Sequence, residues 1–190
     1  MKEIITSYIK ESIQAKQDFF SHNIEKIIEA AEILTRCLIE EKRAVFVFGN
    51  GGSAADSQHF AAELVGRFRK NRSPLPVYAL TTNTSTLTAV GNDYSFVEIF
   101  KRQLEAFLKP RDVVVAISTS GLSPNVLSAV TWAKKMGAFV ISLTGKDGGR
   151  LKEISDISLI VPSIHTSIIQ EVHITCLHIF SYLIEEKLGS

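Results

Sequence analysis

Residues 44–64 combine an apolar run, a glycine turn and the start of a helix within one short stretch. The run 45–48 consists of β-branched and aromatic residues, which is typical of a buried strand. The turn 49–52 contains three glycines, which allow a sharp turn and a close approach of the backbone to a ligand. Ser53 follows as a favourable N-cap, and the free amide groups behind it would attract an anion. The stretch therefore predicts a strand, a phosphate-binding turn and a helix.

His59 and Glu63 lie four residues apart in the helix that this turn would open. That spacing places both side chains on one face of the helix, deeper along it than Ser53. A glycine turn after a strand is common in α/β proteins, and a helical histidine is more often a surface or core residue than a ligand. The occurrence of both features in one turn and helix favours a functional site.

Apolar segments alternate with helical patterns along the rest of the chain. Further strands are expected at 77–80, 112–117, 138–143 and 157–161. Helices are expected at about 96–108 and 124–136, with a break at 91–94 and a stop at Pro110. This alternation predicts an α/β fold, a three-layer α/β/α sandwich with a five-stranded parallel sheet and right-handed crossovers. Ligands in such folds bind beyond the carboxyl ends of the strands.

Residues 2–42 carry an apolar pattern of helical period in two runs, and Ser21 is a candidate cap for the second run. So much helix before the first strand is more than a crossover needs. The pair of helices would either cover the sheet or pack against copies of the chain, and we favour an oligomer interface. We expect one domain over 1–190, in which 43–190 form the α/β core.

The overall composition is that of an ordinary globular protein with a formal net charge of +1. It has no basic stripe with interleaved aromatics, which disfavours nucleic acid as a partner. The start of the chain does not resemble a signal peptide, and no apolar run approaches the roughly 20 residues of a membrane span. Cys37 and Cys176 lack metal-type spacing and are expected to be packed thiols. The sequence therefore predicts a soluble, cytoplasmic protein with no membrane partner.

A second candidate anion site follows the strand at 112–117. Ser118, Thr119, Ser120 and Ser123 offer hydroxyl groups just before Pro124, where a helix would begin with Ser123 as its N-cap. Several donors at the positive end of a helix dipole suit a phosphate monoester. The P-loop signature is missing, which disfavours a nucleoside triphosphate. The alternative is a well-capped helix after a hydroxyl-rich turn, but four hydroxyls in six residues favour function.

The last helix is expected from about 165 to 186 and carries Gln170 and His178. Eight residues separate these two side chains, which is about 12 Å along a helix axis. They can share one metal ion only if both side chains converge or if they come from different subunits. From spacing alone, His178 is as much a helix-interface histidine as a ligand, and the sequence leaves this open.

Several segments, in order along nearly the whole chain, resemble the phosphoheptose isomerase family of sugar-isomerase (SIS) domain enzymes. The matching segments are 48–56, 59–64, 91–93, 117–121, 143–149 and 169–174. The resemblance implies one SIS domain over 1–190 with a flavodoxin-like sandwich, whose helical region 1–42 serves oligomerisation. It also implies a homotetramer with active sites at subunit interfaces.

For function, the resemblance implies conversion of sedoheptulose 7-phosphate, a phosphorylated seven-carbon sugar, into D-glycero-D-manno-heptose 7-phosphate. This is the first step towards activated heptose for bacterial surface polysaccharide. The substrate-binding residues carried over by motif are Asn50, Gly51, Gly52, Ser53, Glu63, Asn92, Asp93, Ser118, Thr119, Ser120, Ser123 and Gln170. One Zn²⁺ per subunit would be bound by His59, Glu63, Gln170 and His178. Glu63 and His178 would form the catalytic acid–base pair.

The implied chemistry fits these residue types. Aldose–ketose isomerisation moves a proton between adjacent carbons through an enediol, so it needs a base at carbon and an acid at oxygen. Zinc would polarise the carbonyl. A lone pair that binds zinc cannot also take a proton, so either ligation loosens during turnover or the ion is partly regulatory or binds only without substrate.

One position departs from the family pattern, because Ile168 stands where members often have arginine. A cation that could help to place the substrate is therefore missing. The alternatives are an isomerase of another phosphosugar, or a non-catalytic SIS-domain module that binds a phosphosugar or a protein, such as the replication-initiator-binding type. The latter group lacks counterparts of Glu63 and His178, and the presence of both here favours an enzyme. A sugar-sensing regulator would need a DNA-binding domain for which the chain has no room.

Overall fold

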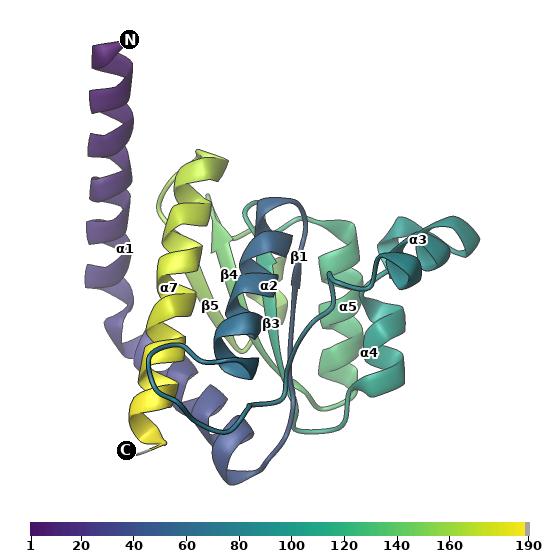
Figure 1. Ribbon diagram of the computed structural model, residues 1–190. Coiled ribbons are helices and arrows are strands. Elements are labelled where there is room, and N and C mark those ends of the chain that lie inside the picture. Colours follow the sequence, from purple (N-terminus) through teal and green to yellow (C-terminus); the bar gives the residue numbers. More distant parts are fainter. Residues whose placement is uncertain (189–190) are drawn as a thin grey trace.

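Five parallel strands form one sheet in the order β2-β1-β3-β4-β5 in the computed structural model, which describes residues 1–188 (Figure 1). The strands are β1 (Val45–Gly49), β2 (Val77–Ala79), β3 (Val113–Ser118), β4 (Phe139–Gly145) and β5 (Ile157–Val161). All strands predicted from the sequence are present. This strand order is that of the flavodoxin-like class, which confirms the predicted fold.

Helices cover both faces of the sheet. In chain order they are α1 (Lys2–Thr35), the π-helical turn η1 (Arg36–Glu40), α2 (Gly52–Val65), α3 (Thr84–Asp93), the 3₁₀ turn η2 (Phe96–Glu98), α4 (Lys101–Phe107), α5 (Pro124–Lys135), α6 (Leu151–Ile154) and α7 (Thr166–Lys187). The expected helix at 96–108 is divided into η2 and α4, and the expected break at 91–94 is wrong, because 91–93 form the last residues of α3.

Two hydrophobic cores flank the sheet because neighbouring residues of a strand point to opposite faces. Val45 and Val47 of β1 belong to the core under α1, α2 and α7. Phe46 and Phe48 belong to the core under α4 and α5, where Phe48 stacks on Phe100. Helices therefore cover most of each face of the sheet.

The predicted pair of N-terminal helices is a single helix, α1, whose N-terminal part projects beyond the sheet (Figure 1). Residues 2–42 contain no glycine or proline to interrupt it. The proposed cap at Ser21 is wrong, because its hydroxyl donates to the carbonyl of Asp18 within the same helix. Much of this helix lacks cover from the rest of the chain. Its exposed isoleucines are Ile4, Ile5, Ile9, Ile13, Ile24 and Ile28.

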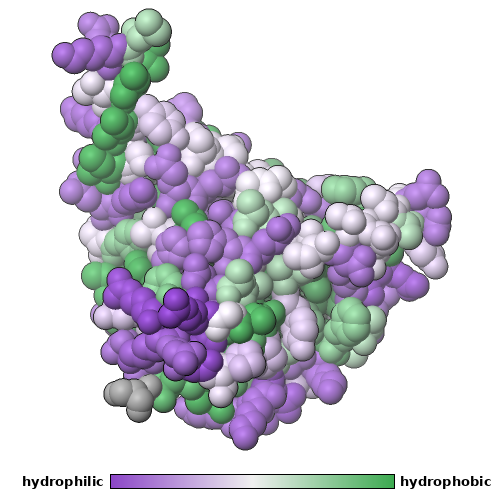
Figure 2. Space-filling model, viewed as in Figure 1, coloured by the Kyte–Doolittle hydropathy of each residue, from purple (hydrophilic) through white to green (hydrophobic). Residues whose placement is uncertain are grey.

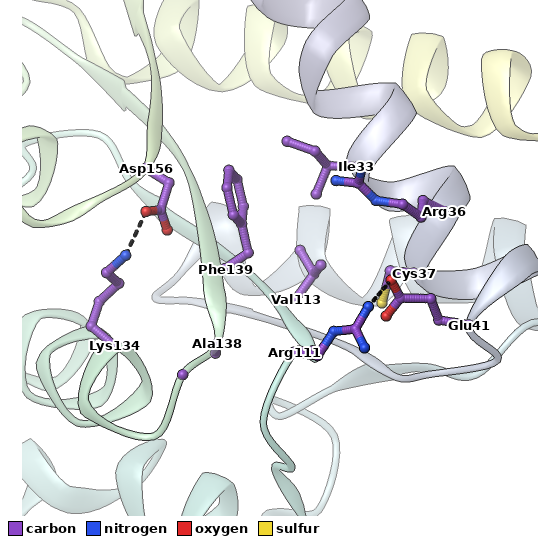
Figure 3. A pocket seen from close by; sticks show the side chains of 11 residues that line it. Ile33, Arg36, Cys37, Glu41, Arg111, Val113, Lys134, Ala138, Phe139 and Asp156 are labelled. Carbon is purple, nitrogen blue, oxygen red and sulfur yellow. Dashed lines mark hydrogen bonds and ion pairs between the residues drawn. The ribbon is translucent and has the colours of Figure 1, made fainter.

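A cavity of about 530 Å³ lies at the amino ends of β3 and β4 (Figure 3). Its rim carries two ion pairs, Arg111 with Glu41 and Lys134 with Asp156. Burial raises the pKa of the Cys37 thiol to about 12, which keeps it protonated and unreactive. The cavity is at the wrong end of a parallel sheet for ligand chemistry. Cys37 is a packed thiol, as predicted, and so is the fully buried Cys176.

Helix α7 is long and apolar enough to pass a length-and-composition criterion for a membrane span, which the sequence analysis did not anticipate. In the fold it packs between α1 and α2 against the sheet. Its buried face also includes the polar side chains of His173 and Glu185. These contacts are those of a core helix.

His173 connects α7 to the sheet. Its imidazole is fully buried, and Nε2 lies 3.0 Å from the carbonyl oxygen of Thr144 in β4. Nε2 therefore carries the hydrogen and donates it, while Nδ1 has no hydrogen-bond partner within residues 1–188. Burial lowers the pKa of His173 to about 4, although the hydrogen bond to Thr144 opposes that shift. The ring is neutral in the folded protein.

We expect the protein to lose stability as the pH falls from 6.5 towards 4. In this window the unfolded chain binds a proton at His173 that the folded chain does not, so protonation favours unfolding. With these pKa values, the loss between pH 7 and pH 5 is about 2 kcal/mol from this residue. Urea unfolding of the wild type and of His173→Gln at both pH values measures it. An equal pH dependence in the two proteins would contradict the assignment.

Candidate active site

The site is built at the point where the order of the strands reverses. β1 pairs with β2 on one side and with β3 on the other, and Gly49 lies opposite Ile117 in the β1–β3 register. The chain leaves these two strands in opposite directions, which opens a crevice at their carboxyl ends. The glycine turn 49–52 and the hydroxyl-rich loop 118–123 follow the two strands directly. Both predicted anion loops therefore lie at this crevice.

The prediction that Ser53 caps α2 is wrong. Gly51 occupies the N-cap position with a φ of 56°, which favours glycine, and Ser53 lies inside the first turn with its side chain buried. The amide of Ser53 donates to the carbonyl of Asn50. Within residues 1–188, the exposed Gly51 and Gly52 have amide groups with no hydrogen-bond partner. Two amides at a helix N-terminus are available for an anion, which leaves the predicted anion site a prediction.

Asn50 is tied to the start of α5. Its carboxamide and that of Asn125 exchange two hydrogen bonds of 2.9 Å each. Asn125 is buried and also accepts from the amide of Val126. Each carboxamide keeps one N–H for another partner. The pair holds the two loops together, and sequence analysis missed Asn125 because its partner is 75 residues away.

The loop 118–123 is held by short contacts. The hydroxyls of Ser118 and Ser123 lie 3.0 Å apart, and Ser120 accepts from the amide of Leu122. Ser123 occupies the N-cap position of α5, but its hydroxyl makes no capping hydrogen bond.

Gly121 of the same loop has a φ of 64°, and a Cβ there would lie 2.0 Å from the carbonyl oxygen of Gly148. Only glycine allows this approach of the loop after β4, so the loop is fixed from both sides. Ser118 is buried, whereas Thr119 and Ser120 are half-buried at the rim.

Helices α2 and α7 bring three polar side chains together. Nε2 of His59 lies 3.0 Å from Oε1 of Glu63 and 3.3 Å from Nε2 of His178. Ligand atoms of all three residues lie within 4.8 Å of one another. The two imidazoles meet edge to face, with ring centroids 4.9 Å apart. His178 thus lies against His59 of the same chain.

The cluster has the geometry of a metal site. Two ligands bound at about 2.0–2.1 Å to a tetrahedral zinc ion are roughly 3.3 Å apart, close to the separation of the two Nε2 atoms. Burial and the neighbouring His59 lower the pKa of His178, although Glu63 opposes them. A neutral imidazole is the form that binds a metal or accepts a proton. The three residues form a possible metal-binding arrangement.

Asp56, one turn before His59, is a further titratable group that sequence analysis did not single out. Burial raises the pKa of its carboxyl group to about 6, although the charge of His59 opposes the shift. Its Oδ2 atom is buried and has no hydrogen-bond partner within residues 1–188. A carboxyl group that titrates this close to neutrality is a candidate for proton transfer. A raised pKa of this kind depends on tertiary burial, which a helical pattern does not reveal.

The remaining predicted residues do not join the cluster within this chain. The amide of Gln170 packs over Gly52, where a Cβ would be 2.5 Å from its Nε2, and no hydrogen bond within residues 1–188 joins it to the histidines. Asn92 donates to Asp93 at the exposed end of α3, which lies away from the crevice (Figure 1). Ile168 is buried.

Comparisons with known proteins match this architecture. The SIS domain family matches residues 7–145. A probable phosphoheptose isomerase of Thermoplasma acidophilum is 51% identical over 95% of this chain and 97% of its own length. A phosphoheptose isomerase of Syntrophotalea carbinolica is 50% identical over 97% of this chain and 93% of its own length.

The solved structure of a phosphoheptose isomerase from Neisseria gonorrhoeae superposes with a TM-score of 0.92, at 42% identity. The similarity covers 97% of this chain and 98% of that one. Sequence, fold and length therefore agree from end to end, and the chain belongs to the phosphoheptose isomerase family of SIS-domain proteins.

Proposed function

We propose that this protein converts sedoheptulose 7-phosphate into D-glycero-D-manno-heptose 7-phosphate. The observation that carries the proposal is the Glu63–His59–His178 cluster, whose ligand atoms lie within 4.8 Å of one another on the two helices α2 and α7. A short phosphorylated chain would have its phosphate at the two predicted anion loops and its reacting carbons at the carboxylate and imidazole. The product would supply activated heptose for surface polysaccharide. A cytoplasmic location is consistent with the two free buried thiols.

In the proposed reaction, Glu63 takes the proton from C1 of the ketose and returns it to C2. His178 delivers a proton to the carbonyl oxygen on C2 and accepts the hydroxyl proton on C1, so that protons balance over the cycle. A carboxylate has two oxygens, and only Oε1 of Glu63 faces His59. The other oxygen can therefore act on carbon.

We propose one Zn²⁺ per subunit, bound by His59, Glu63 and His178, with Gln170 as a further ligand after its side chain moves from Gly52. When bound, zinc would polarise substrate oxygens as a Lewis acid. Nε2 of His178 faces the cluster, and this nitrogen cannot hold a metal ion and a proton at the same time. Activity with and without a chelator therefore distinguishes a catalytic ion from a regulatory one.

We also propose a homotetramer with active sites at subunit interfaces, assembled through 1–42 of a single domain that spans 1–190. The six exposed isoleucines of α1 support an interface, and Figure 2 shows hydrophobic residues gathered along the projecting helix. Asn92 and Asp93 lie at the exposed end of α3, so a role for them in substrate binding would favour shared sites.

We expect purified protein to convert sedoheptulose 7-phosphate to the aldose, and Glu63→Gln to lower kcat by at least about 1000-fold. The amide keeps the shape of the side chain but cannot accept the proton from carbon. Glu153→Gln, at an exposed position of α6, is the matched control and should keep full activity. Product formation is followed by chromatography, and retained activity in Glu63→Gln would show that the base is misassigned.

The same assay tests the alternatives. A chain that binds the sugar phosphate without converting it would be a non-catalytic binding module. Conversion of a different phosphosugar at a higher kcat/KM would redirect the substrate assignment. The presence of both Glu63 and His178 in one cluster favours the enzyme.

Ser120→Ala should raise KM for the phosphorylated sugar by about 10- to 100-fold and change kcat little, because a hydroxyl–phosphate hydrogen bond contributes about 1.5–3 kcal/mol. Ser155→Ala, at the amino end of β5, is the control. An unchanged KM in Ser120→Ala would remove this hydroxyl from the phosphate site.

Replacement of Ile9 by Asp should dissociate the oligomer. Ile9 is 52% exposed on the projecting part of α1. In a symmetric oligomer the substitution would bury an unpaired carboxylate at every copy of the contact, which should raise the dissociation constant of the assembly by about 100-fold or more. Light scattering after size exclusion measures the mass. Phe107→Asp, on α4 and 62% exposed, serves as the control. A wild-type monomer, or an Ile9→Asp protein of unchanged mass, would reject this interface.

A further inference from the structure

A buried carboxylate outside the cluster organises the segment between α2 and β2. This segment has no regular structure and crosses α7 near its C-terminal end (Figure 1). Glu185 of α7 is fully buried and accepts hydrogen bonds from three successive amides, those of Phe68, Arg69 and Lys70, at 2.8–3.0 Å. Nε of Arg72 lies 3.2 Å from the same carboxylate. The Glu185 carboxylate therefore accepts hydrogen bonds from three successive backbone amides of this segment.

Arg72 connects this carboxylate to the end of α2. Its guanidinium donates to the carbonyls of Glu63 at 2.7 Å and of Leu64 at 2.6 Å. These carbonyls belong to the last turn of α2 and have no partners inside the helix. The Glu185–Arg72 pair thus fixes the backbone of Glu63 itself, together with the turn that follows.

The turn carries an aromatic ring to the cluster. Phe68 stacks on the imidazole of His178, with ring centroids 5.8 Å apart and planes at 22°. The guanidinium of Arg69 lies 4.3 Å from the ring centre of Tyr182 and 5.6 Å from that of Phe68. His178 is therefore held between the edge of His59 and the face of Phe68.

The residues of α7 that make these contacts share one face. His178, Tyr182 and Glu185 are spaced by four and three residues, so they follow one another along the helix surface. Burial raises the pKa of Glu185, but the amide hydrogen bonds and Arg72 outweigh it and hold this pKa below its ordinary value. The carboxylate is ionised and fully engaged with the turn, so it takes no part in proton transfer.

We infer that Glu185 and Arg72 are positioning residues that hold Phe68 against His178 and thereby set the orientation of its imidazole. The inference rests on the proposed function, in which the orientation of that ring matters for catalysis. A simple anchor for the loop would not need a flat aromatic ring over His178. If this holds, a substitution at Glu185 will displace Phe68 and thereby alter the orientation of the His178 ring.

Nuclear magnetic resonance of the metal-free protein tests this link without any activity. The Phe68 ring should shift the ring-proton signals of His178, which His178→Gln identifies among the five histidines. Phe68→Leu should remove that shift. Glu185→Gln should move the His178 signals in the same direction as Phe68→Leu does. If Glu185→Gln does not fold, Arg72→Lys replaces it, because lysine keeps the charge but not the forked contacts. A folded Glu185→Gln or Arg72→Lys protein with an unchanged His178 shift would overturn the inference.

Kinetics and metal binding give the second readout. Phe68→Leu should lower kcat about tenfold with KM within twofold, and should weaken Zn²⁺ binding, measured by competition with a chelating dye, about tenfold. Phe107→Leu is the matched control, because Phe107 is exposed on α4. A Phe68→Leu protein with wild-type kcat and zinc affinity would overturn the positioning role. If the wild type lacks isomerase activity, the proposed function fails, while the resonance shifts still decide the link.

Discussion

The parallel pairing of β1 with β3 is the contact on which the site depends. These strands are neighbours in the sheet although about 60 residues separate them, and the register sets Gly49 opposite Ile117. The turns that follow must then emerge side by side. Gly49 permits this closeness, because a Cβ there would lie 2.7 Å from both the carbonyl of Ile117 and the Cβ of Ser53. Any other residue would push α2 away from β3.

The features that the sequence predicted well are local ones. The apolar run 112–117 indicates a strand, and the spacing of His59 and Glu63 defines a helix face whatever the tertiary structure. The isomerase family was identified from motifs of the same local kind. The long α1 was predicted as two helices because Ser21 is a plausible cap, yet a cap matters only where the helix must stop.

Most features that the sequence missed depend on distant partners, and the N-cap of α2 is a local exception. Ser53 is a good N-cap by residue type, but the positive φ of Gly51 moves the cap two residues earlier. Asn125 and Glu185 are polar residues within helical patterns, and each acquires a role only through a residue far along the chain. The meeting of His59 with His178 required the packing of α2 on α7. Local patterns in a single sequence do not show which distant residues will pair in the fold.

Helix α7 joins these distant pairings into one rigid element. Gln170 near its start covers Gly52, His173 is bonded to β4, His178 completes the cluster and Glu185 near its end holds the turn after α2. A rotation or a one-turn shift of α7 would disrupt all four contacts at once. The site is therefore as stable as the packing of this helix.

Helix α1 contacts α7 through the carboxylate of Glu171. Tyr8 donates to Oε1 of Glu171 at 2.7 Å, Ser12 donates to Oε2, and Lys16 lies 3.6 Å away. Hydrogen bonds from Ser12 lower the pKa of Glu171 against the effect of burial, so the anion is the stable form. Glu171 adjoins Gln170, which lies over the glycine turn. Because the same part of α1 also presents the exposed isoleucines, a contact between chains at α1 would restrain the start of α7 and hence Gln170. In the proposed oligomer, assembly and site geometry would thus be mechanically connected, which is a physical reason for a small enzyme to keep the exposed N-terminal part of α1.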